Sequence, residues 1–155
     1  MKQLLSGLLT LLLMLSLGAC ADNSVGVTPN MESVFASMAD QLPEALPFDA
    51  ESVFNAYGVE SAACKQEVVV SYYDGSRTAE LWLIEAVDQE AAESIKTLAQ
   101  TRLDSMGSQF RSYDAAAYAL VQEAKLFTHG NCVVMIVSEN ADALLDIYQT
   151  AAELT

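Results

Sequence analysis

The sequence has very little histidine and few basic residues. His129 is the only histidine, and seven Lys and Arg residues stand against 21 Asp and Glu, which gives a formal net charge of −14. A zinc site needs several His or Cys ligands, and a Ser-His-Asp triad could be built only on His129. So acidic a chain is also repelled by nucleic acid and by anionic lipid surfaces. We therefore expect no metal site and no nucleic-acid partner.

Catalytic motifs are lacking as well. The chain contains no Gly-x-Ser-x-Gly elbow, no phosphate-binding glycine loop and no acidic calcium loop. Glu80 and Glu85 could form an acid-base pair only on a shared face, but residues five apart on a strand point to opposite faces. We expect a protein that is not an enzyme and has no cofactor. An envelope hydrolase is the last of the alternatives.

The N-terminus carries the clearest signal that is present. A leucine-rich run follows Lys2 and ends in Leu17-Gly18-Ala19-Cys20, which is typical of a signal peptide with a lipobox. A transmembrane anchor would need about 20 uninterrupted apolar residues, and this run is broken by Ser6, Thr10 and Ser16. We expect cleavage before Cys20, lipid on Cys20, and a chain that faces outward from the cell membrane to which this lipid attaches it.

The domain organisation follows from this signal. Residues 1–19 are expected to be the signal peptide, and residues 20–30, with Asn, Ser, Gly and Pro but no apolar period, a lipidated cysteine and flexible tether. Residues 31–155 have enough apolar content for one compact core and are expected to form a single domain.

Two cysteines remain after lipidation. An exported compartment permits a disulfide between Cys64 and Cys132 if both begin adjacent strands. The alternative is that each thiol is a small buried apolar group. Both interpretations stay open at the level of sequence.

Apolar spacing predicts the secondary structure. Helical spacing covers 31–42 and 49–57, and the second of these helices has Asp49 as its N-cap and Gly58 at its end. A hairpin follows over 67–87, then a long helix that Asp88 caps. The same order returns as a hairpin over 123–138 and a terminal helix that Ser138 caps.

These elements read as a doubled ββα unit and predict an α+β fold. We expect a four-stranded antiparallel sheet with the two longer helices on one face. The strands around Trp82 and over 133–137 are apolar on both sides, so the second face also needs a cover. The short N-terminal helices over 31–57 are expected to cover it in part.

An incomplete cover would leave a binding face on the sheet. Trp82, Tyr72, Phe127 and Met135 are the side chains that could line an apolar cleft for a peptide, a lipid or a partner protein. The alternative is that the N-terminal helices close this face and Trp82 is part of the core. Arg102 is expected to pair with nearby carboxylates and to pack its stem against the fold.

The chain resembles a known family at several points. The similarity lies in Tyr57-Gly58-Val59, Ala63-Cys64-Lys65-Gln66, the stretch from Arg77 to Ala86, Arg102, Tyr113 and Gly130-Asn131. In these residues the chain resembles the small bacterial lipoproteins of domain-of-unknown-function family 4358. The resemblance implies a recurrent envelope domain with no assigned activity. Cys132 departs from the family pattern, which weakens the case for a disulfide with Cys64.

Together these observations predict a lipid-anchored extracytoplasmic domain that acts as a non-enzymatic binding or interaction module of the cell envelope. Its partner is expected to be an envelope protein, a peptide or a small ligand. The main alternative is a small-ligand or peptide-binding lipoprotein associated with transport. A single small domain lacks the two lobes that are usual for such receptors.

Overall fold

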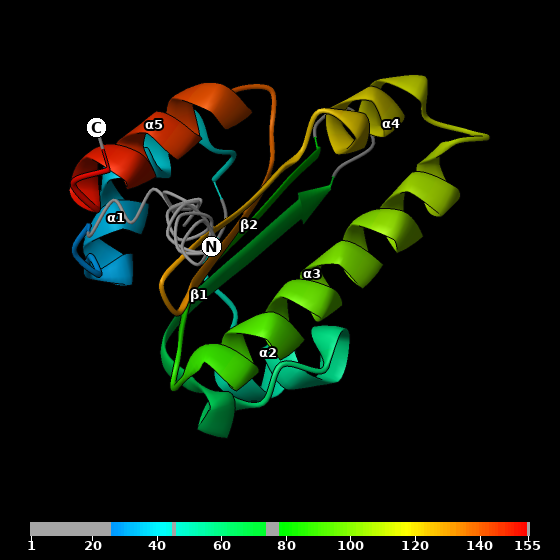
Figure 1. The fold of residues 1–155 in the computed structure, drawn as a ribbon. Coiled ribbons are helices and arrows are strands. Elements are labelled where there is room, and N and C mark those ends of the chain that lie inside the picture. The colour runs from blue at the N-terminus through cyan, green and yellow to red at the C-terminus, as the bar shows by residue number, and fades with distance from the viewer. Residues whose placement is uncertain (1–25, 45, 74–77, 155) are drawn as a thin grey trace, which may run out of the picture.

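A four-stranded antiparallel sheet forms the centre of the molecule (Figure 1). The computed structural model describes residues 26–44, 46–73 and 78–154. The strands are β1 (Cys64–Tyr73), β2 (Thr78–Ala86), β3 (Lys125–His129) and β4 (Cys132–Val137), in the spatial order β1-β2-β4-β3. In the register, Trp82 of β2 lies opposite Val69 of β1 and Met135 of β4. The predicted α+β class and antiparallel sheet are confirmed.

One face of the sheet, here called the Trp82 face, packs against three helices: α2 (Ala50–Tyr57), α3 (Gln89–Phe110) and α4 (Ala115–Gln122). Trp82, Ile84 and Met135 point into this layer and are inaccessible to solvent. The apolar side of α3 is the one that its spacing predicted, with Ala92, Ile95, Ala99, Leu103, Met106 and Phe110 all buried. This layer therefore holds the larger part of the core.

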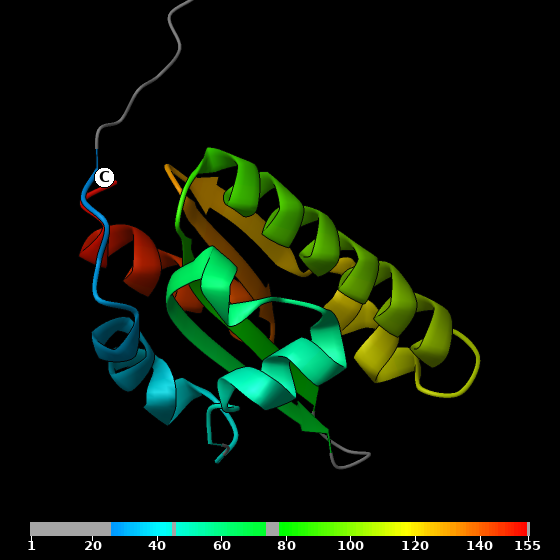
Figure 2. The same ribbon diagram turned by 90° about the horizontal axis from the view of Figure 1, so that it is seen from below.

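The opposite face, here called the Leu81 face, packs against α1 (Met31–Met38) and α5 (Ala141–Ala151). Leu81, Leu83 and Ile136 alternate with the residues of the Trp82 face and are equally buried. Figure 2 shows α1 and α5 on one side of the sheet and α2 and α3 on the other.

The predicted placement of the helices was therefore wrong in one respect. The two longer helices, α3 and α5, lie on opposite faces and not on one. Every residue of β4 is buried, so both faces need a large apolar cover, and each receives one long helix and part of the N-terminal segment. The short helices α1 and α2 are likewise divided between the two faces.

The predicted capping residues are found at the ends of α2 and at the start of α3. Asp49 accepts a hydrogen bond from Ser52 N at 2.8 Å, and Gly58 ends α2 with φ 76°. Asp88 caps α3 by accepting from Ala91 N at 2.9 Å. Ser138 is not the N-cap of α5, because that helix begins after Asn140, whose backbone N–H donates to Ser138 Oγ.

The flexible tether was expected to extend to residue 30, but its last residues are attached to the domain. Val27 N donates to Ala152 O at 2.9 Å, so residues 26–30 run along the domain. The signal peptide and Cys20 lie outside the described residues. Within the described part of the chain, no helix is both long and apolar enough to cross a membrane.

Candidate functional site

The four residues expected to line one cleft do not come together. Trp82 and Met135 are opposite each other in the sheet and fully buried on the Trp82 face. Phe127 packs on the Leu81 face, where its ring lies 6.0 Å from that of Tyr148. Tyr72 follows Val70 by two positions and so points to the Leu81 face as well. The predicted cleft on the second face is therefore corrected, and Trp82 belongs to the core.

A buried carboxylate lies beside Trp82. Glu80 has an exposed fraction of only 1% and is held by a bidentate ion pair, in which Arg102 Nη2 lies 2.7 Å from Oε2 and Nε lies 3.0 Å from Oε1. Trp82 Nε1 donates to Oε1 at 3.0 Å, and Ser71 Oγ donates to Oε2 at 3.2 Å. Arg102 thus pairs with a carboxylate as predicted, and its partner comes from β2.

Tyr57 closes this cluster from α2. The Arg102 guanidinium lies 5.3 Å from the centre of the Tyr57 ring, and the Tyr57 and Trp82 rings are 5.0 Å apart. Burial raises the pKa of the Tyr57 hydroxyl, and the hydrogen bond to Glu80 raises the pKa of Arg102. Both Glu80 oxygens accept from several donors, and the ion pair joins β2 to α3.

Cys64 and Cys132, the cysteines within the described part of the chain, are both free thiols. Strand β2 lies between β1 and β4, and Cys64 packs with the core of the Trp82 face whereas Cys132 lies in that of the Leu81 face. A disulfide needs Cα atoms about 4.4 to 6.8 Å apart, which two strand spacings of about 4.8 Å exceed. The candidate disulfide is therefore corrected. Burial raises the pKa of Cys64 to about 12 and also raises that of Cys132, which makes both thiols poor nucleophiles.

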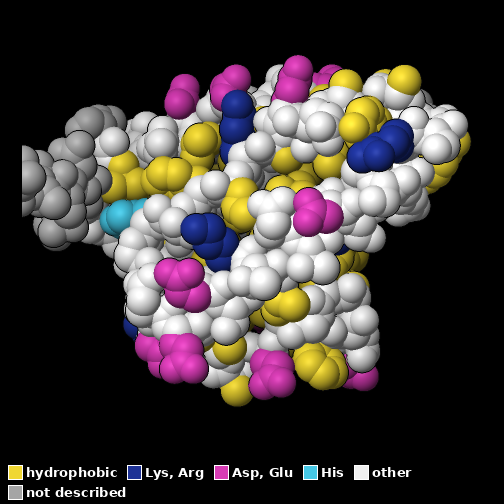
Figure 3. Space-filling model, turned by 45° about the vertical axis from the view of Figure 1, so that its right-hand side comes forward, with side chains coloured by type: hydrophobic (Ala, Val, Ile, Leu, Met, Phe, Trp, Pro, Cys, Tyr) yellow, Lys and Arg dark blue, Asp and Glu magenta, His cyan; other side chains and the backbone are white. Residues whose placement is uncertain are grey.

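His129 is the remaining polar candidate. It ends β3, and its Nδ1 is buried and has no hydrogen-bond partner among the residues that the structure describes. Among the described residues, no three His, Cys, Asp or Glu side chains are placed to hold a metal ion. The face in Figure 3 carries carboxylates at several places and few Lys or Arg side chains, which agrees with the acidic composition.

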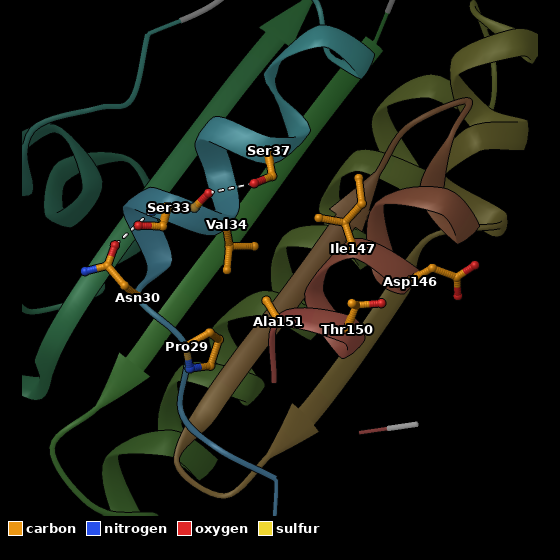
Figure 4. Close-up of a pocket in the computed structure, with 9 residues that line it drawn as sticks. All are labelled: Pro29, Asn30, Ser33, Val34, Ser37, Asp146, Ile147, Thr150 and Ala151. Carbon is orange, nitrogen blue, oxygen red and sulfur yellow. Dashed lines mark hydrogen bonds between the residues drawn. The ribbon is translucent and has the colours of Figure 1, made fainter. Parts of the chain in front are cut away.

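A groove lies between α1 and α5, and we call it the α1–α5 groove. Its volume is about 580 Å³, within the range of ligand sites. Figure 4 shows Val34 of α1 and Ile147 of α5 on its two sides and Asp146 pointing outward from the far side of α5. The lining residues are Pro29, Asn30, Ser33, Val34, Ser37, Asp146, Ile147, Thr150 and Ala151.

Small side chains create this groove. Ser33, Ser37 and Ala151 line the groove where α1 and α5 pack against each other, and their small side chains leave it unfilled. Ser37 Oγ donates to Ser33 O at 3.0 Å, within its own helix, and Asn30 accepts from Ser33 N at 2.8 Å. Because these polar groups are satisfied locally, the groove presents mainly apolar surface.

Two further hollows are less suited to a binding role. One lies between α3 and α4 and has a volume of about 440 Å³, with polar residues such as Gln100, Asp104 and Arg111 in its wall. The other, of about 410 Å³, lies between Gly58 and the first turns of α3 and includes Glu60 and Glu90. Neither of them has both mainly apolar walls and, beside it, the segment that leads back to Cys20, as the α1–α5 groove has.

Sequence reasoning missed the groove because α1 was expected only to cover the sheet. The available signal was the spacing of Ser33 and Ser37, four apart on α1, which places small residues on one side of the helix. That spacing alone does not reveal a partner helix more than 100 positions later in the chain.

Comparison with known proteins gives one result. The model of the family described as Domain of unknown function (DUF4358) matches residues 38–138, which confirms the resemblance seen in the sequence. No curated protein and no solved structure matches the chain. The matched range includes the sheet and the Glu80–Arg102 pair, but it starts at the last residue of α1 and ends before α5. The family match therefore leaves out most of the α1–α5 groove.

Proposed function

The chain belongs to the DUF4358 family, and we propose that it is a lipid-anchored, outward-facing binding module of the cell envelope. In this proposal Cys20 carries the lipid, and the α1–α5 groove is the binding site. The observation that carries it is an apolar groove of about 580 Å³ next to the segment that leads back to Cys20.

The proposed ligand is a peptide segment of an envelope protein. The wall supplied by α1 runs from Asn30 to Ser37, a rise of about 10 Å. That length suits two or three apolar side chains of a bound helix or extended segment, which would lie against Val34, Ile147 and Ala151. Burial of these side chains supplies the affinity.

A binding role also agrees with the state of the reactive groups. Glu80 is fully engaged by Arg102, Trp82 and Ser71, and the raised pKa values of Cys64 and Cys132 disfavour a thiolate. A general acid or a nucleophile needs a group that can meet the substrate and change its protonation state. We therefore propose no enzymatic activity.

Photo-cross-linking in intact cells tests the groove. A photoreactive amino acid replaces Ser37 in the full chain, and a matched variant carries it at Lys96, which is exposed on α3. A discrete cross-linked product is expected from the Ser37 position and none from Lys96. Equal products from both positions, or none from either, would contradict the proposed site.

Lipid attachment is tested separately. Cys20→Ser removes the thiol that would carry the lipid, whereas Cys64→Ser alters a thiol on β1. We expect incorporation of a labelled fatty acid, and recovery in the membrane fraction, to be lost in the first variant and kept in the second. Incorporation that persists in Cys20→Ser would refute the anchor.

A further inference from the structure

The segment before α1 is fastened to the domain at several points. Val27 N donates a hydrogen bond to Ala152 O at the end of α5. The side chain of Gln66 on β1 accepts a hydrogen bond from Met31 N at 3.0 Å and donates one to Pro29 O at 3.4 Å. A Cβ on Gly26 would lie 2.4 Å from Ala152 O, so the chain passes here in close contact with α5. Figure 2 shows this segment and the end of α5 at the same corner.

This fastening limits the distance between the groove and the lipid. Seven residue steps separate Cys20 from Val27, and even a fully extended chain of that length spans only about 25 Å. Pro29 and Asn30, which begin the wall of the groove, follow within three residues of Val27. A lipid on Cys20 would therefore keep the α1–α5 groove close to the membrane surface. Helix α3 is about 33 Å long and runs away from that corner (Figure 2).

We propose that the α1–α5 groove binds the outward-facing juxtamembrane segment of an integral membrane protein in the same membrane. This inference rests on the proposed function, because it requires both the lipid on Cys20 and binding in the groove. The short connection gives such a segment a high local concentration at the groove, whereas an envelope component farther from the membrane has no such advantage.

The charge around the groove favours a polypeptide over an anionic lipid headgroup as the occupant. Neither α1 nor α5 contains Lys or Arg, and Asp142 and Asp146 lie on α5. The basic side chain that reaches α5, Lys125, is paired with Asp142 at 2.7 Å. Anionic headgroups are repelled by such a surface, and so is the same surface of a second copy. We therefore take the occupant to be a polypeptide whose apolar side chains enter the groove, and not an anionic headgroup or a second copy.

The test changes the length of the connection. A flexible Gly/Ser spacer of about 20 residues, with a mean span of about 25 Å, is inserted between Val25 and Gly26 in the full chain that carries the photoreactive residue at Ser37. The matched control carries the same spacer after Thr155. We expect the cross-linked product to be an integral membrane protein, and its yield to fall about fivefold on insertion but not in the control.

The outcomes separate the two proposals. A product from Ser37 whose yield is unchanged by the N-terminal spacer would overturn the juxtamembrane partner and leave the groove as a binding site. A product that consists of lipid would overturn it in favour of the bilayer. If the chain without a spacer gives no more product from Ser37 than from Lys96, the proposed function itself fails.

Discussion

The two faces of the sheet are covered to different degrees. Three helices close the Trp82 face, and the buried carboxylate of Glu80 is paired there with Arg102, Trp82 and Ser71. Two helices cover the Leu81 face, and they leave an apolar groove of about 580 Å³ between them. From this comparison we propose a division of roles, in which the Trp82 face stabilises the fold and the groove outside the Leu81 face binds a partner.

The largest loss of stability is expected on the Trp82 face. Trp82→Ala removes the largest buried side chain and one donor to Glu80, and should lower the free energy of unfolding by about 4 kcal/mol. Tyr113→Ala is the control, because that ring is 60% exposed, and should cost under about 1 kcal/mol. Urea unfolding followed by circular dichroism measures both, and similar losses would contradict the assignment of Trp82 to the core.

The ion pair should show the next effect. Arg102→Ala leaves Glu80 buried without its cation and should cost about 3 kcal/mol. Arg111→Ala, which loses a contact with the Tyr118 ring, should cost under about 1 kcal/mol. The double variant Glu80→Gln with Arg102→Met should be more stable than Arg102→Ala alone. A double variant that is less stable would show that the unpaired charge is not the cause.

Alkaline pH should destabilise both faces through buried thiols. Burial raises the pKa of Cys64 from 9.0 to about 12 and raises that of Cys132 from the same value. Above pH 9 the unfolded chain loses these protons before the folded chain does, so stability falls as pH rises from about 9 toward 12. Denaturant midpoints over this range should show a smaller fall in Cys64→Ala, and an equal fall would exclude Cys64 as a source.

The smallest effect on stability is expected in the groove. Ala151→Phe places a ring in the gap between α1 and α5, and Ala143→Phe makes the same change on α5 away from the groove. Both alanines are exposed, so each variant should stay within about 0.5 kcal/mol of the unchanged chain in urea unfolding. A loss of several kcal/mol in Ala151→Phe alone would mean that the groove is closed core.

Much of the fold could be predicted because its signals are local. The period of α3 and the capping positions of Asp49 and Asp88 depend on residues within one or two turns. The side of each helix could not be predicted, because β4 is buried throughout and has no alternation that distinguishes the two faces.

The candidate site was harder to predict for the same physical reason. The pairing of Arg102 with a carboxylate could be predicted because the chain is rich in Asp and Glu. That the partner is Glu80 could not be predicted, because it depends on how α3 packs on β2. The α1–α5 groove depends on how far apart two helices from opposite ends of the chain settle, and no local pattern contains that distance. The cleft predicted around Trp82 failed because a helix layer covers that face.

The most direct test of the α1–α5 groove as the binding site combines the last pair of variants with photo-cross-linking from Ser37 in cells. With the groove filled by Ala151→Phe, the cross-linked product should fall at least about tenfold, which corresponds to a loss of about 1.4 kcal/mol in binding. With Ala143→Phe it should be unchanged. An undiminished product in a folded, membrane-bound Ala151→Phe chain would show that the partner binds elsewhere.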